Sequence, residues 1–459
     1  MLLDDIAPYV TPYYILPSLL ALAALPLLRK ATRSSPTFAA QTSAAMPDHT
    51  VVVLGAGFVG VAMAHHLLKH TPADVASLKV VLVAPNDALY WNVAAPRGFL
   101  PADDDKVDSA KGTPGFGDDK LFYPLAPLFA KYNASGAARF EQLVGRATRL
   151  DPDAQTVDVA IIGGTSSTTT TVAYDTLLVA TGSDIVGGVP FKILSSGGTA
   201  ETKAALAAYR AAIGAAKHIV VAGGGMTGVE LAGELGSAYG KTKAIQLIVS
   251  EAAPLAVYGV KDGVQQQALG QLKGLGVTVV AGTRVAGTEV QGQKTVLTLE
   301  GKTSDTLATD VYIPAFGITF NTQFVPAKLL DTSATGKGRV RTRKTLQAEG
   351  YDNIFVAGDA ANLQAPSLKN ADDQVQVLSA QLQTYLKALA AKEPAALSEF
   401  PAGQGLVVAV SIGPGGGTGQ VGSWRLFSFL LWVLKARFLG TNYAGEIAAG
   451  TRTPGNSKW

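Results

Sequence analysis

The feature that most constrains this sequence is a glycine-rich turn that occurs twice, each time between an apolar β-branched run and a helical pattern. In a GxGxxG turn, the first glycine permits the tight bend and the second lets the backbone approach a pyrophosphate. The third lets the helix pack closely on the strand. One match is weak evidence, but two matches in the same context predict two dinucleotide-binding units. The glycines are Gly55, Gly57 and Gly60 in the first turn (GAGFVG) and Gly223, Gly225 and Gly228 in the second (GGGMTG).

The rest of the chain alternates between strand and helix patterns, which predicts an α/β fold. Each glycine turn belongs to a strand–helix–strand unit, the first starting at Thr50 and the second at His218. Between the units, alternation around Gly163 and Gly164 predicts a β-hairpin that leads into the strand LLVATG. The strand NIFVAGD comes later and is followed by a predicted helix to about Ala390. A further strand, a glycine turn and an apolar segment end the chain.

The composition limits the chemistry that the side chains can perform. The 459 residues include no cysteine, which excludes a thiolate nucleophile, a disulfide relay and a Cys-ligated metal. The formal net charge of +3 gives no strong basic field, so no nucleic-acid partner is expected. No metal site is expected either, because the histidines show no ligand spacing; His65, His66 and His70 read as one solvated helix face. Redox chemistry would therefore reside in a bound cofactor.

Two apolar segments flank this body. Tyr9–Leu28 is about long enough to span a bilayer, but its prolines weaken it as a helix. A membrane anchor and a removable or disordered leader both stay open for this segment. Trp424–Phe438 is apolar nearly all round and too short to span as one helix. It either lies in a membrane interface with Arg425, Lys435 and Arg437 near the headgroups, or packs as a core helix.

Further motifs carry a resemblance to a known family. The strand ends LLVATG (Leu177–Gly182) and VAGDAAN, which contains Gly358 and Asp359, occur in an order that resembles the two-dinucleotide flavoprotein superfamily. The stretches ALYWNVAAPRG, GGGMTGVELAGEL and VAVSIGPGGGTGQVG look most like its apoptosis-inducing-factor-homologous branch. That branch contains the ferroptosis suppressor proteins, which are NAD(P)H:quinone oxidoreductases acting at membranes, and it is related to type II NADH dehydrogenases. The resemblance runs from about Val51 to the carboxyl terminus.

The resemblance implies two Rossmann-like dinucleotide-binding domains, in which an inserted NAD(P)H domain interrupts the FAD domain. A small C-terminal α+β region follows them. The expected divisions are 1–49 for an apolar leader and linker, 50–195 and 321–395 for the two parts of the FAD domain, 196–320 for the NAD(P)H domain, and 396–459 for a C-terminal region in contact with a membrane.

The resemblance also implies which residues hold FAD. Asn92, Val93 and Arg97 would lie along the flavin, Ala147 would offer its backbone to the adenine, and Asp359 would hold the ribityl or phosphate region. The full expected set is Gly55, Gly57, Phe58, Val59, Gly60, Asn86, Asn92, Val93, Arg97, Ala147, Ala180, Thr181, Gly182, Gly358 and Asp359.

One departure from the superfamily pattern concerns the FAD unit. The acid expected after its second strand, which would bind ribose hydroxyls, is missing, because Ala84 and Pro85 occupy that place. Asn86 or Asp87 would have to substitute for it. Weak retention of FAD is an expected consequence.

The second turn is expected to hold the nicotinamide nucleotide. The resemblance places Glu230 at the nicotinamide and flavin edge as the catalytic side chain; the alternative is an acid that stabilises its own helix N-terminus. Ser250 and Glu251 follow a strand where ribose hydroxyls bind, without a nearby Arg for a 2′-phosphate, which favours NADH over NADPH. The full expected set is Gly223, Gly225, Met226, Gly228, Ser250, Glu251 and Gly317.

These expectations combine into one function, in which NADH gives a hydride to FAD and the reduced flavin passes electrons to a quinone. The alternatives are a flavin monooxygenase, an electron-transfer dehydrogenase with a protein acceptor, and a signalling flavoprotein in which FAD is mainly structural. The apolar termini favour a membrane-associated protein that faces the cytoplasm or belongs to mitochondria. The sequence does not indicate an oligomeric state.

Overall fold

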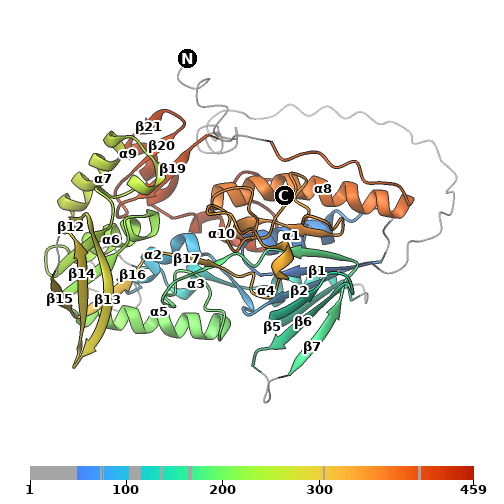
Figure 1. Cartoon of the computed structure of the whole chain (residues 1–459), viewed down its shortest axis with the longest axis horizontal. Coiled ribbons are helices and arrows are strands. Elements are labelled where there is room, and N and C mark those ends of the chain that lie inside the picture. The colour runs from blue at the N-terminus through green and yellow to red at the C-terminus, as the bar shows by residue number, and fades with distance from the viewer. Residues whose placement is uncertain are drawn as a thin grey trace, which may run out of the picture.

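The structure, a computed structural model, describes residues 49–72, 75, 77–102, 115–134, 138–163, 168–302, 305–401 and 405–459. The expected leader Tyr9–Leu28 and the tip of the predicted hairpin at Gly164 lie outside these residues. Within them, two α/β bodies lie side by side, and the C-terminal region packs across both (Figure 1). The bodies correspond to the two dinucleotide-binding units expected from the glycine turns.

The first body is built on a sheet with the strand order β18-β8-β1-β2-β5-β6-β7. Its first five strands run parallel, whereas β6 and β7 continue from β5 as an antiparallel meander that includes the predicted hairpin. In sheet order, the strands are β18 (Ile354–Val356), β8 (Thr176–Val179), β1 (His49–Leu54), β2 (Leu78–Ala84), β5 (Phe140–Asp151), β6 (Thr156–Ile161) and β7 (Thr169–Ala173).

Both faces of this sheet are covered, which explains the continuous apolar runs of its central strands. Because side chains alternate along a strand, Val51 and Val53 face α1 (Phe58–Lys69) and α8 (Leu368–Ala391). Val52 and Leu54 face the opposite side, where β6 and the segment around Phe324 pack. The helix predicted to end near Ala390 ends at Ala391. Short elements beside α1 are β3 (Ala88–Tyr90), the 3-10 helix Asn92–Ala94, α2 (Ala95–Gly98), α3 (Asp118–Leu121), β4 (Phe122–Pro124) and α4 (Leu125–Phe129).

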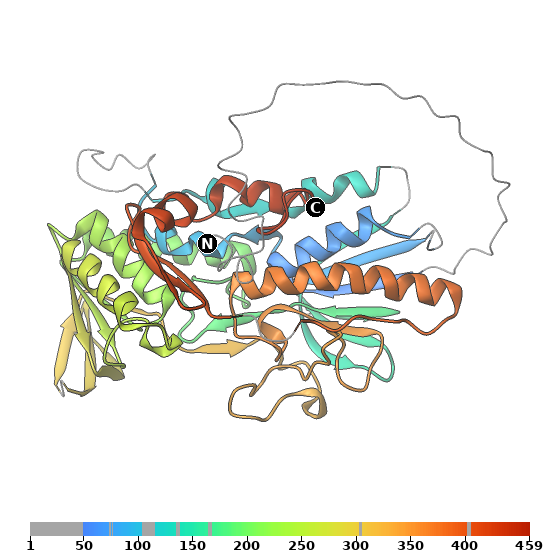
Figure 2. The same cartoon turned by 90° about the horizontal axis from the view of Figure 1, so that it is seen from above.

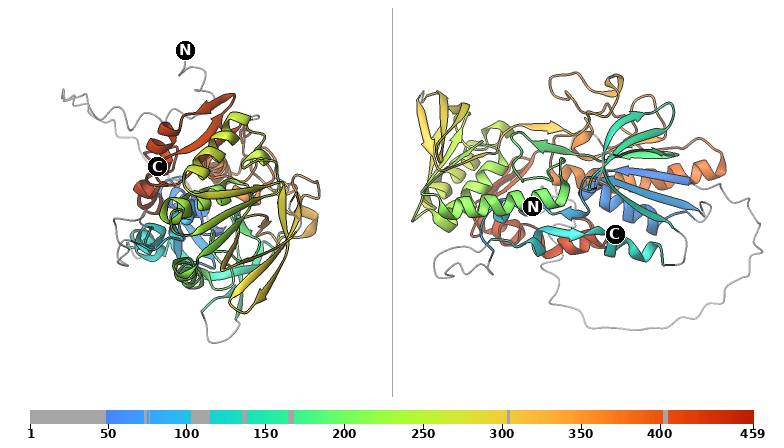
Figure 3. Two further views of the ribbon diagram at one scale, coloured as in Figure 1. Left: turned by 90° about the vertical axis from the view of Figure 1, so that its left-hand side faces the viewer. Right: turned by 90° about the horizontal axis from the view of Figure 1, so that it is seen from below.

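The second body has a parallel sheet with the order β12-β11-β10-β16 and a small antiparallel sheet, β13-β14-β15. The antiparallel sheet lies at the end of the molecule remote from α8 (Figure 3, right). The elements, in chain order, are α5 (Gly198–Ala215), β10 (His218–Ala222), α6 (Met226–Tyr239), β11 (Ala244–Val249), α7 (Asp262–Gly274), β12 (Val277–Ala281), β13 (Thr283–Gln291), β14 (Lys294–Gly301), β15 (Thr306–Thr309) and β16 (Val311–Pro314).

Two paired strands connect the bodies: the chain leaves the first body through one and returns to it through the other. The strands β9 (Ser183–Ile185) and β17 (Ile318–Phe320) lie antiparallel to each other between the bodies. The second body is therefore inserted between two parts of the first, as the resemblance implied. The residue numbers at which we divided the chain into domains stay predictions.

The C-terminal region begins as a three-stranded antiparallel sheet beside the second body and ends in helices that reach the first (Figure 2). The expectation that Trp424–Phe438 forms one helix is wrong. Its first three residues pair with β20, because a short turn at Gly422 and Ser423 returns the chain along the sheet edge before the helix starts. The elements are β19 (Val407–Ser411), β20 (Gly417–Val421), β21 (Trp424–Leu426), α9 (Ser428–Leu431), the π-helix Trp432–Ala436 and α10 (Thr441–Ala448).

The solvated face expected for the α1 histidines is also wrong for two of them. The side chains of His65 and His66 are buried, because α10 and the carboxyl terminus pack on that face of α1, and only His70 is exposed. His65 bonds the Tyr132 hydroxyl through Nδ1 and the Ala448 carbonyl through Nε2. Burial lowers the pKa of His65 to about 3 and that of His66 to about 4. These side chains are therefore neutral parts of the core.

Among the helices in the described part of the chain, none combines the length and apolar character that crossing a bilayer requires.

Candidate functional site

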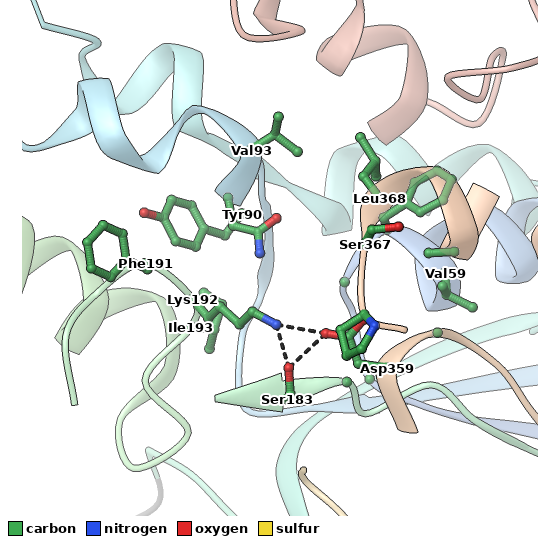
Figure 4. Close-up of a pocket in the computed structure, with 18 of the residues that line it drawn as sticks. Val59, Tyr90, Val93, Ser183, Phe191, Lys192, Ile193, Asp359, Ser367 and Leu368 are labelled. Carbon is green, nitrogen blue, oxygen red and sulfur yellow. Dashed lines mark hydrogen bonds and ion pairs between the residues drawn. The ribbon is translucent and has the colours of Figure 1, made fainter. Parts of the chain in front are cut away.

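A cavity of about 1640 Å³ lies between the two bodies and under the C-terminal region. Pockets for one small molecule typically measure about 300–1,000 Å³, so this one has room for an elongated cofactor and a second ligand. Its walls combine the first glycine turn, the start of α6 and the C-terminal helices. Figure 4 shows side chains on the first-body side of this cavity, among them Val59, Lys192 and Asp359, around one space.

The first glycine turn forms the floor of the cavity, and its geometry requires glycine. Gly55 has φ +108°, and a Cβ there would lie 2.3 Å from the Ala180 carbonyl oxygen. A Cβ on Gly60 would lie 1.8 Å from the Gly55 carbonyl oxygen, so α1 packs on the turn without space for a side chain. Gly57, the N-cap of α1, has no atom within 4 Å of its Cβ position. The turn therefore leaves an open cradle at a helix N-terminus, which suits a pyrophosphate.

Most residues expected to hold FAD line this cavity. They are Gly55, Gly57, Phe58, Val59, Asn86, Asn92, Val93, Ala147, Ala180, Thr181, Gly182, Gly358 and Asp359. Ala147 stands at a register shift between β5 and β6, which leaves backbone outside the regular ladder. Gly60 lies behind the turn and serves packing instead.

At the place of the missing ribose acid, the structure puts Asn86 rather than Asp87 on the cavity wall. The buried Asn86 amide donates to the carbonyl oxygens of Ala56 and Ala88, at 3.1 and 2.7 Å. These bonds direct the Nδ2 atom toward the protein, while Asp87 is exposed. The FAD unit therefore offers an amide where the superfamily pattern has a carboxylate.

Asp359 belongs to a charged triad that the sequence pattern alone did not indicate. Its carboxylate lies 2.8 Å from the Lys192 ammonium and accepts a 2.7 Å hydrogen bond from the Ser183 hydroxyl (Figure 4). Lys192 also contacts the Ser183 hydroxyl, at 2.5 Å. All three side chains line the cavity. The triad therefore pairs the late Gly-Asp with a cation that follows the LLVATG strand.

Arg97, expected along the flavin, is engaged elsewhere. Its buried guanidinium forms a bidentate pair with Glu234 of α6, at 2.7 and 2.8 Å, and donates to the carbonyls of Ala436 and Arg437. Burial raises the pKa of Glu234, and the Arg97 guanidinium opposes that rise. This ion pair joins the first body, the second body and the π-helix. Among the described residues, Arg97 is not part of the cavity wall.

The second glycine turn repeats the backbone geometry of the first. Gly223 has φ +133°, and its Cβ would lie 2.4 Å from the Ala315 carbonyl oxygen; a Cβ on Gly228 would lie 2.0 Å from the Gly223 carbonyl oxygen. Met226, at the start of α6, lines the cavity. The helix that follows the second turn thus begins at the cavity that the first turn lines.

The remaining residues expected at the nucleotide lie around this turn. Ser250 and Glu251 directly follow β11, and the Ser250 hydroxyl donates to the Glu251 carboxylate at 2.8 Å. Gly317, with φ +69°, lies after β16 and before β17. Of the described residues expected here, Met226 and Glu230 reach the cavity wall, whereas Gly223, Gly225, Gly228, Ser250, Glu251 and Gly317 lie outside it.

Glu230 reaches from α6 to the C-terminal region. Its carboxylate accepts hydrogen bonds from the Ser411 amide and hydroxyl, at 3.1 and 3.2 Å, and lies 2.7 Å from the Lys435 ammonium. The helix dipole stabilises an acid most strongly within the first turn of a helix. Glu230 is the fifth residue of α6 and therefore lies beyond that turn. These contacts therefore favour a role for Glu230 at the cavity over a role in stabilising the N-terminus of α6.

Lys435 is a site residue whose partner the sequence did not indicate. Instead of pointing to headgroups, its side chain turns inward, pairs with Glu230 and donates to the Ala409 carbonyl at 2.8 Å. It sits in the π-helix, a distortion that is common at functional sites. The available signal was a cationic residue inside an apolar segment, because burying an ammonium requires a partner.

The C-terminal helices also form the apolar mouth of the cavity. Leu434 and Phe438 line the cavity yet are 41% and 40% exposed. Phe427 and Phe429, on the adjacent surface, are about 70% exposed. An apolar surface therefore continues from the outside of the protein into the cavity.

Within the described ranges, no group of three or more His, Asp or Glu side chains is arranged to hold a metal ion. The open cradle at Gly57 and the charged triad at Asp359 instead fit an elongated anionic cofactor such as FAD.

Comparison with known proteins agrees with this geometry. Oxidoreductase ptaL of Pestalotiopsis fici is 34% identical over 388 residues, covering 84% of this chain and 95% of that protein. Ferroptosis suppressor protein 1 of Taeniopygia guttata is 29% identical over 399 residues, covering 85% and 93%. The solved sulfide:quinone oxidoreductase of Aquifex aeolicus has the same fold, with a TM-score of 0.62 at 16% identity, covering 88% of this chain and 92% of that one.

The family comparison covers both bodies. Residues 49–381 match the family described as pyridine nucleotide-disulphide oxidoreductase. The cofactors that this match supports are FAD and NAD(P)H, in line with two dinucleotide turns. The chain has no cysteine, so the disulphide chemistry in the family's name is not performed by its own thiols. This protein is an FAD- and NAD(P)H-dependent oxidoreductase that belongs to the pyridine nucleotide-disulphide oxidoreductase family.

Proposed function

We propose that this protein oxidises NADH and passes the electrons through FAD to a quinone. The observation that carries the proposal is the cavity, which is continuous from the first glycine turn past the start of α6 to an apolar mouth. Bound FAD would supply the chemistry that accepts a hydride and returns two electrons. The balance is one NADH, one proton and one quinone giving NAD⁺ and one quinol.

The residues proposed to hold FAD are those of the first turn and the charged triad. The cradle at Gly57 would take the pyrophosphate on the N-terminus of α1. Asp359 would accept from the ribityl hydroxyls, with Lys192 and Ser183 holding its carboxylate in place. Because Asn86 replaces the ribose acid, FAD retention should be weaker than with a carboxylate there.

The second turn is proposed to hold the nicotinamide nucleotide. Its glycines repeat the geometry of the first turn, and Met226 faces the shared cavity. Ser250 and Glu251 stand at the end of β11, where a carboxylate can accept from both ribose hydroxyls and repels a 2′-phosphate. NADH is therefore proposed as the preferred donor.

Glu230 and Lys435 are proposed to deliver the proton that the reaction takes from solvent. They form an ion pair on the cavity wall, partly shielded from water, where a carboxylate and an ammonium can exchange a proton between them. The Ser411 amide and hydroxyl hold the carboxylate in one orientation. A proton leaving Lys435 toward the quinone oxygen can be replaced through Glu230.

The apolar mouth supports a quinone as the acceptor. A quinone has a polar head that must reach the redox cofactor and an apolar tail that needs cover. Leu434 and Phe438 offer that cover along the entrance, since both line the cavity and contact solvent. The sulfide:quinone oxidoreductase named above shares this fold but, at 16% identity, says nothing of this chain's acceptor.

We also propose that the surface around Phe427 and Phe429 docks on a membrane that faces the cytoplasm or belongs to mitochondria. Large exposed aromatic side chains cost hydration free energy that contact with lipid recovers. Docking there would place the cavity mouth next to the bilayer, where apolar quinones dissolve. In this proposal the surface lies in the interface and does not span it.

The acceptor is tested by reoxidation of the reduced holoprotein. The enzyme, reduced anaerobically with one equivalent of NADH, is mixed with a short-chain ubiquinone analogue, with oxygen, or with an oxidised ferredoxin. Reoxidation by the quinone should be the fastest. Equal rates with all acceptors, or turnover only with the redox protein, would contradict the quinone proposal. Failure of NADH to reduce the FAD in the first step would favour a structural FAD.

Membrane docking is tested with Phe427→Ser and Phe429→Ser in liposome flotation. Binding should fall at least several-fold while flavin reduction by NADH is unchanged, because both side chains are exposed. The matched control is Val290→Ser, which removes a 76% exposed apolar side chain from the remote strand β13. Equal flotation of all variants would contradict docking by this surface.

A further inference from the structure

The hydroxyl of Tyr258 sits on the second glycine turn. It accepts a hydrogen bond from the Met226 backbone amide, with a nitrogen–oxygen distance of 3.1 Å. A Cβ on Gly225 would lie 3.2 Å from the same oxygen. Tyr258 also lines the cavity. The phenol therefore covers the second glycine and the first amide of α6.

These are the groups that a dinucleotide needs. In this turn the second glycine admits the pyrophosphate, and the amides at the helix N-terminus donate to it. A backbone amide carries one hydrogen, so Met226 cannot donate fully to a phenol and to a phosphate at once. The first turn has no such cover, since Gly57 has open space at the same position. A nucleotide must therefore displace Tyr258 to use the second turn in full.

The segment that carries Tyr258 is tied to the turn that it covers. Leu255 is fully buried in the left-handed region, at φ +67°, and its amide donates to the Gly224 carbonyl at 2.7 Å. The 3-10 turn Ala256–Tyr258 follows, and Gly259, at φ +64°, ends it. A bulky residue in the left-handed region stores backbone strain that its surroundings must hold. The segment is therefore anchored at Leu255 and can pivot at Gly259.

Phosphate has the advantage in competition for the amide. Burial raises the pKa of Tyr258, so the phenol is neutral at physiological pH. Hydrogen bonds to an ionised acceptor are roughly twice as strong as those between neutral groups. A pyrophosphate can therefore replace the phenol, but the lost Tyr258 bond reduces its net affinity.

We propose that Tyr258 is a latch on the nicotinamide-nucleotide site, which holds the Met226 amide in the free protein and is displaced by the pyrophosphate of the incoming nucleotide. The inference rests on the proposed assignment of the second turn to that nucleotide. The latch acts on the pyrophosphate, so it weakens NADH, NAD⁺ and ADP-ribose alike. It also favours release of NAD⁺ after the hydride has left.

The test measures the Kd of ADP-ribose and of NAD⁺ for the oxidised, FAD-loaded protein by isothermal titration calorimetry. Y258F keeps the ring and removes the competing oxygen, so both ligands should bind about fivefold tighter, the worth of one net hydrogen bond. Tyr258→Leu, which also lacks the oxygen, should shift both Kd values in the same direction. The matched control Tyr239→Phe, at the far end of α6, should leave both unchanged.

Unchanged or weaker binding by Y258F would overturn the latch, since a phenol that helps to hold the nucleotide predicts a loss. Another outcome would contradict the nucleotide site itself. If the wild-type protein retains FAD but binds neither ADP-ribose nor NAD⁺, the nucleotide site on the second turn is wrong and the latch falls with it.

Discussion

The two glycine turns share a backbone and differ in what faces them. Gly55 and Gly223 both adopt positive φ, and a Cβ on either would collide with the carbonyl oxygen of the residue that directly follows the neighbouring strand. Gly60 and Gly228 both leave less than 2.1 Å between their Cβ positions and the carbonyl oxygen of the first glycine. Each motif therefore specifies the same bend by excluding side chains at the same places.

The side chains around the two turns differ, and the difference suits different ligands. Gly57 stands open, whereas the phenol of Tyr258 covers Gly225. The fifth residue of the following helix is Ala62 in α1 and Glu230 in α6. The first turn is thus a plain cradle, suited to a cofactor that stays. The second turn carries a removable cover and an acid, which suits a ligand that binds, reacts and leaves.

The largest expected effect comes from replacing the first glycine of each turn, where the two backbones are alike. Gly55→Ala and Gly223→Ala should each lower the free energy of unfolding of their own body by about 4 kcal/mol, because strain at positive φ adds to a backbone collision. Gly55→Ala should lose FAD, whereas Gly223→Ala should keep FAD and lose binding of ADP-ribose. Urea unfolding and flavin content after acid precipitation measure this. FAD loss from both variants alike would contradict separate roles for the turns.

A smaller effect is expected from the ion pair that links α6 to the first body. Arg97→Met leaves the buried Glu234 without its partner and should lower the free energy of unfolding by about 3 kcal/mol. Adding Glu234→Leu should restore most of that loss, since a buried pair is often replaceable by apolar side chains. Exposed Glu141→Gln on β5 is the control. An Arg97→Met protein as stable as wild type would show that the pair does not contribute to stability.

Replacing Glu230, the acid that distinguishes α6 from α1, is expected to affect turnover. Glu230→Gln keeps acceptance from Ser411 but removes the charge next to Lys435, so quinone reduction should slow by about 100-fold. The FAD content and the Kd of ADP-ribose should not change. Unaltered turnover would return Glu230 to a purely structural role.

The smallest expected effect is a pH dependence of stability that originates in α1. His65 is buried with its pKa lowered to about 3, so below pH 6.5 the unfolded chain binds protons that the folded protein does not. Stability should be constant above pH 7, and His65 alone should lower it by about 1 kcal/mol between pH 6.5 and 5.5, with a similar fall from His66. His65→Gln should reduce this slope, whereas His70→Gln, at the exposed end of the helix, should change it little. A slope that is equal in both variants would contradict the buried neutral histidine.

The parts predictable from sequence are those encoded by local pattern. The two turns, the hairpin before LLVATG and the end of α8 follow from glycine spacing and apolar periodicity, which act within a few residues. Lys435, Tyr258 and the Arg97–Glu234 pair depend on elements far apart in the sequence. His65 was misread for the same reason, because the sequence of α1 does not show that α10 covers it. Side-chain partners across domains are set by tertiary packing, which local pattern does not record.

The most direct test of the account is anaerobic mixing of the FAD-loaded protein with NADH, followed by flavin absorbance in a stopped-flow instrument. The wild-type protein should lose its flavin absorbance, faster with NADH than with NADPH. Gly225→Val should retain its FAD without being bleached, because the side chain blocks the second turn alone. If neither nucleotide bleaches the FAD-loaded wild-type protein, the result would contradict the claim that a nucleotide bound at the second turn reduces FAD bound at the first.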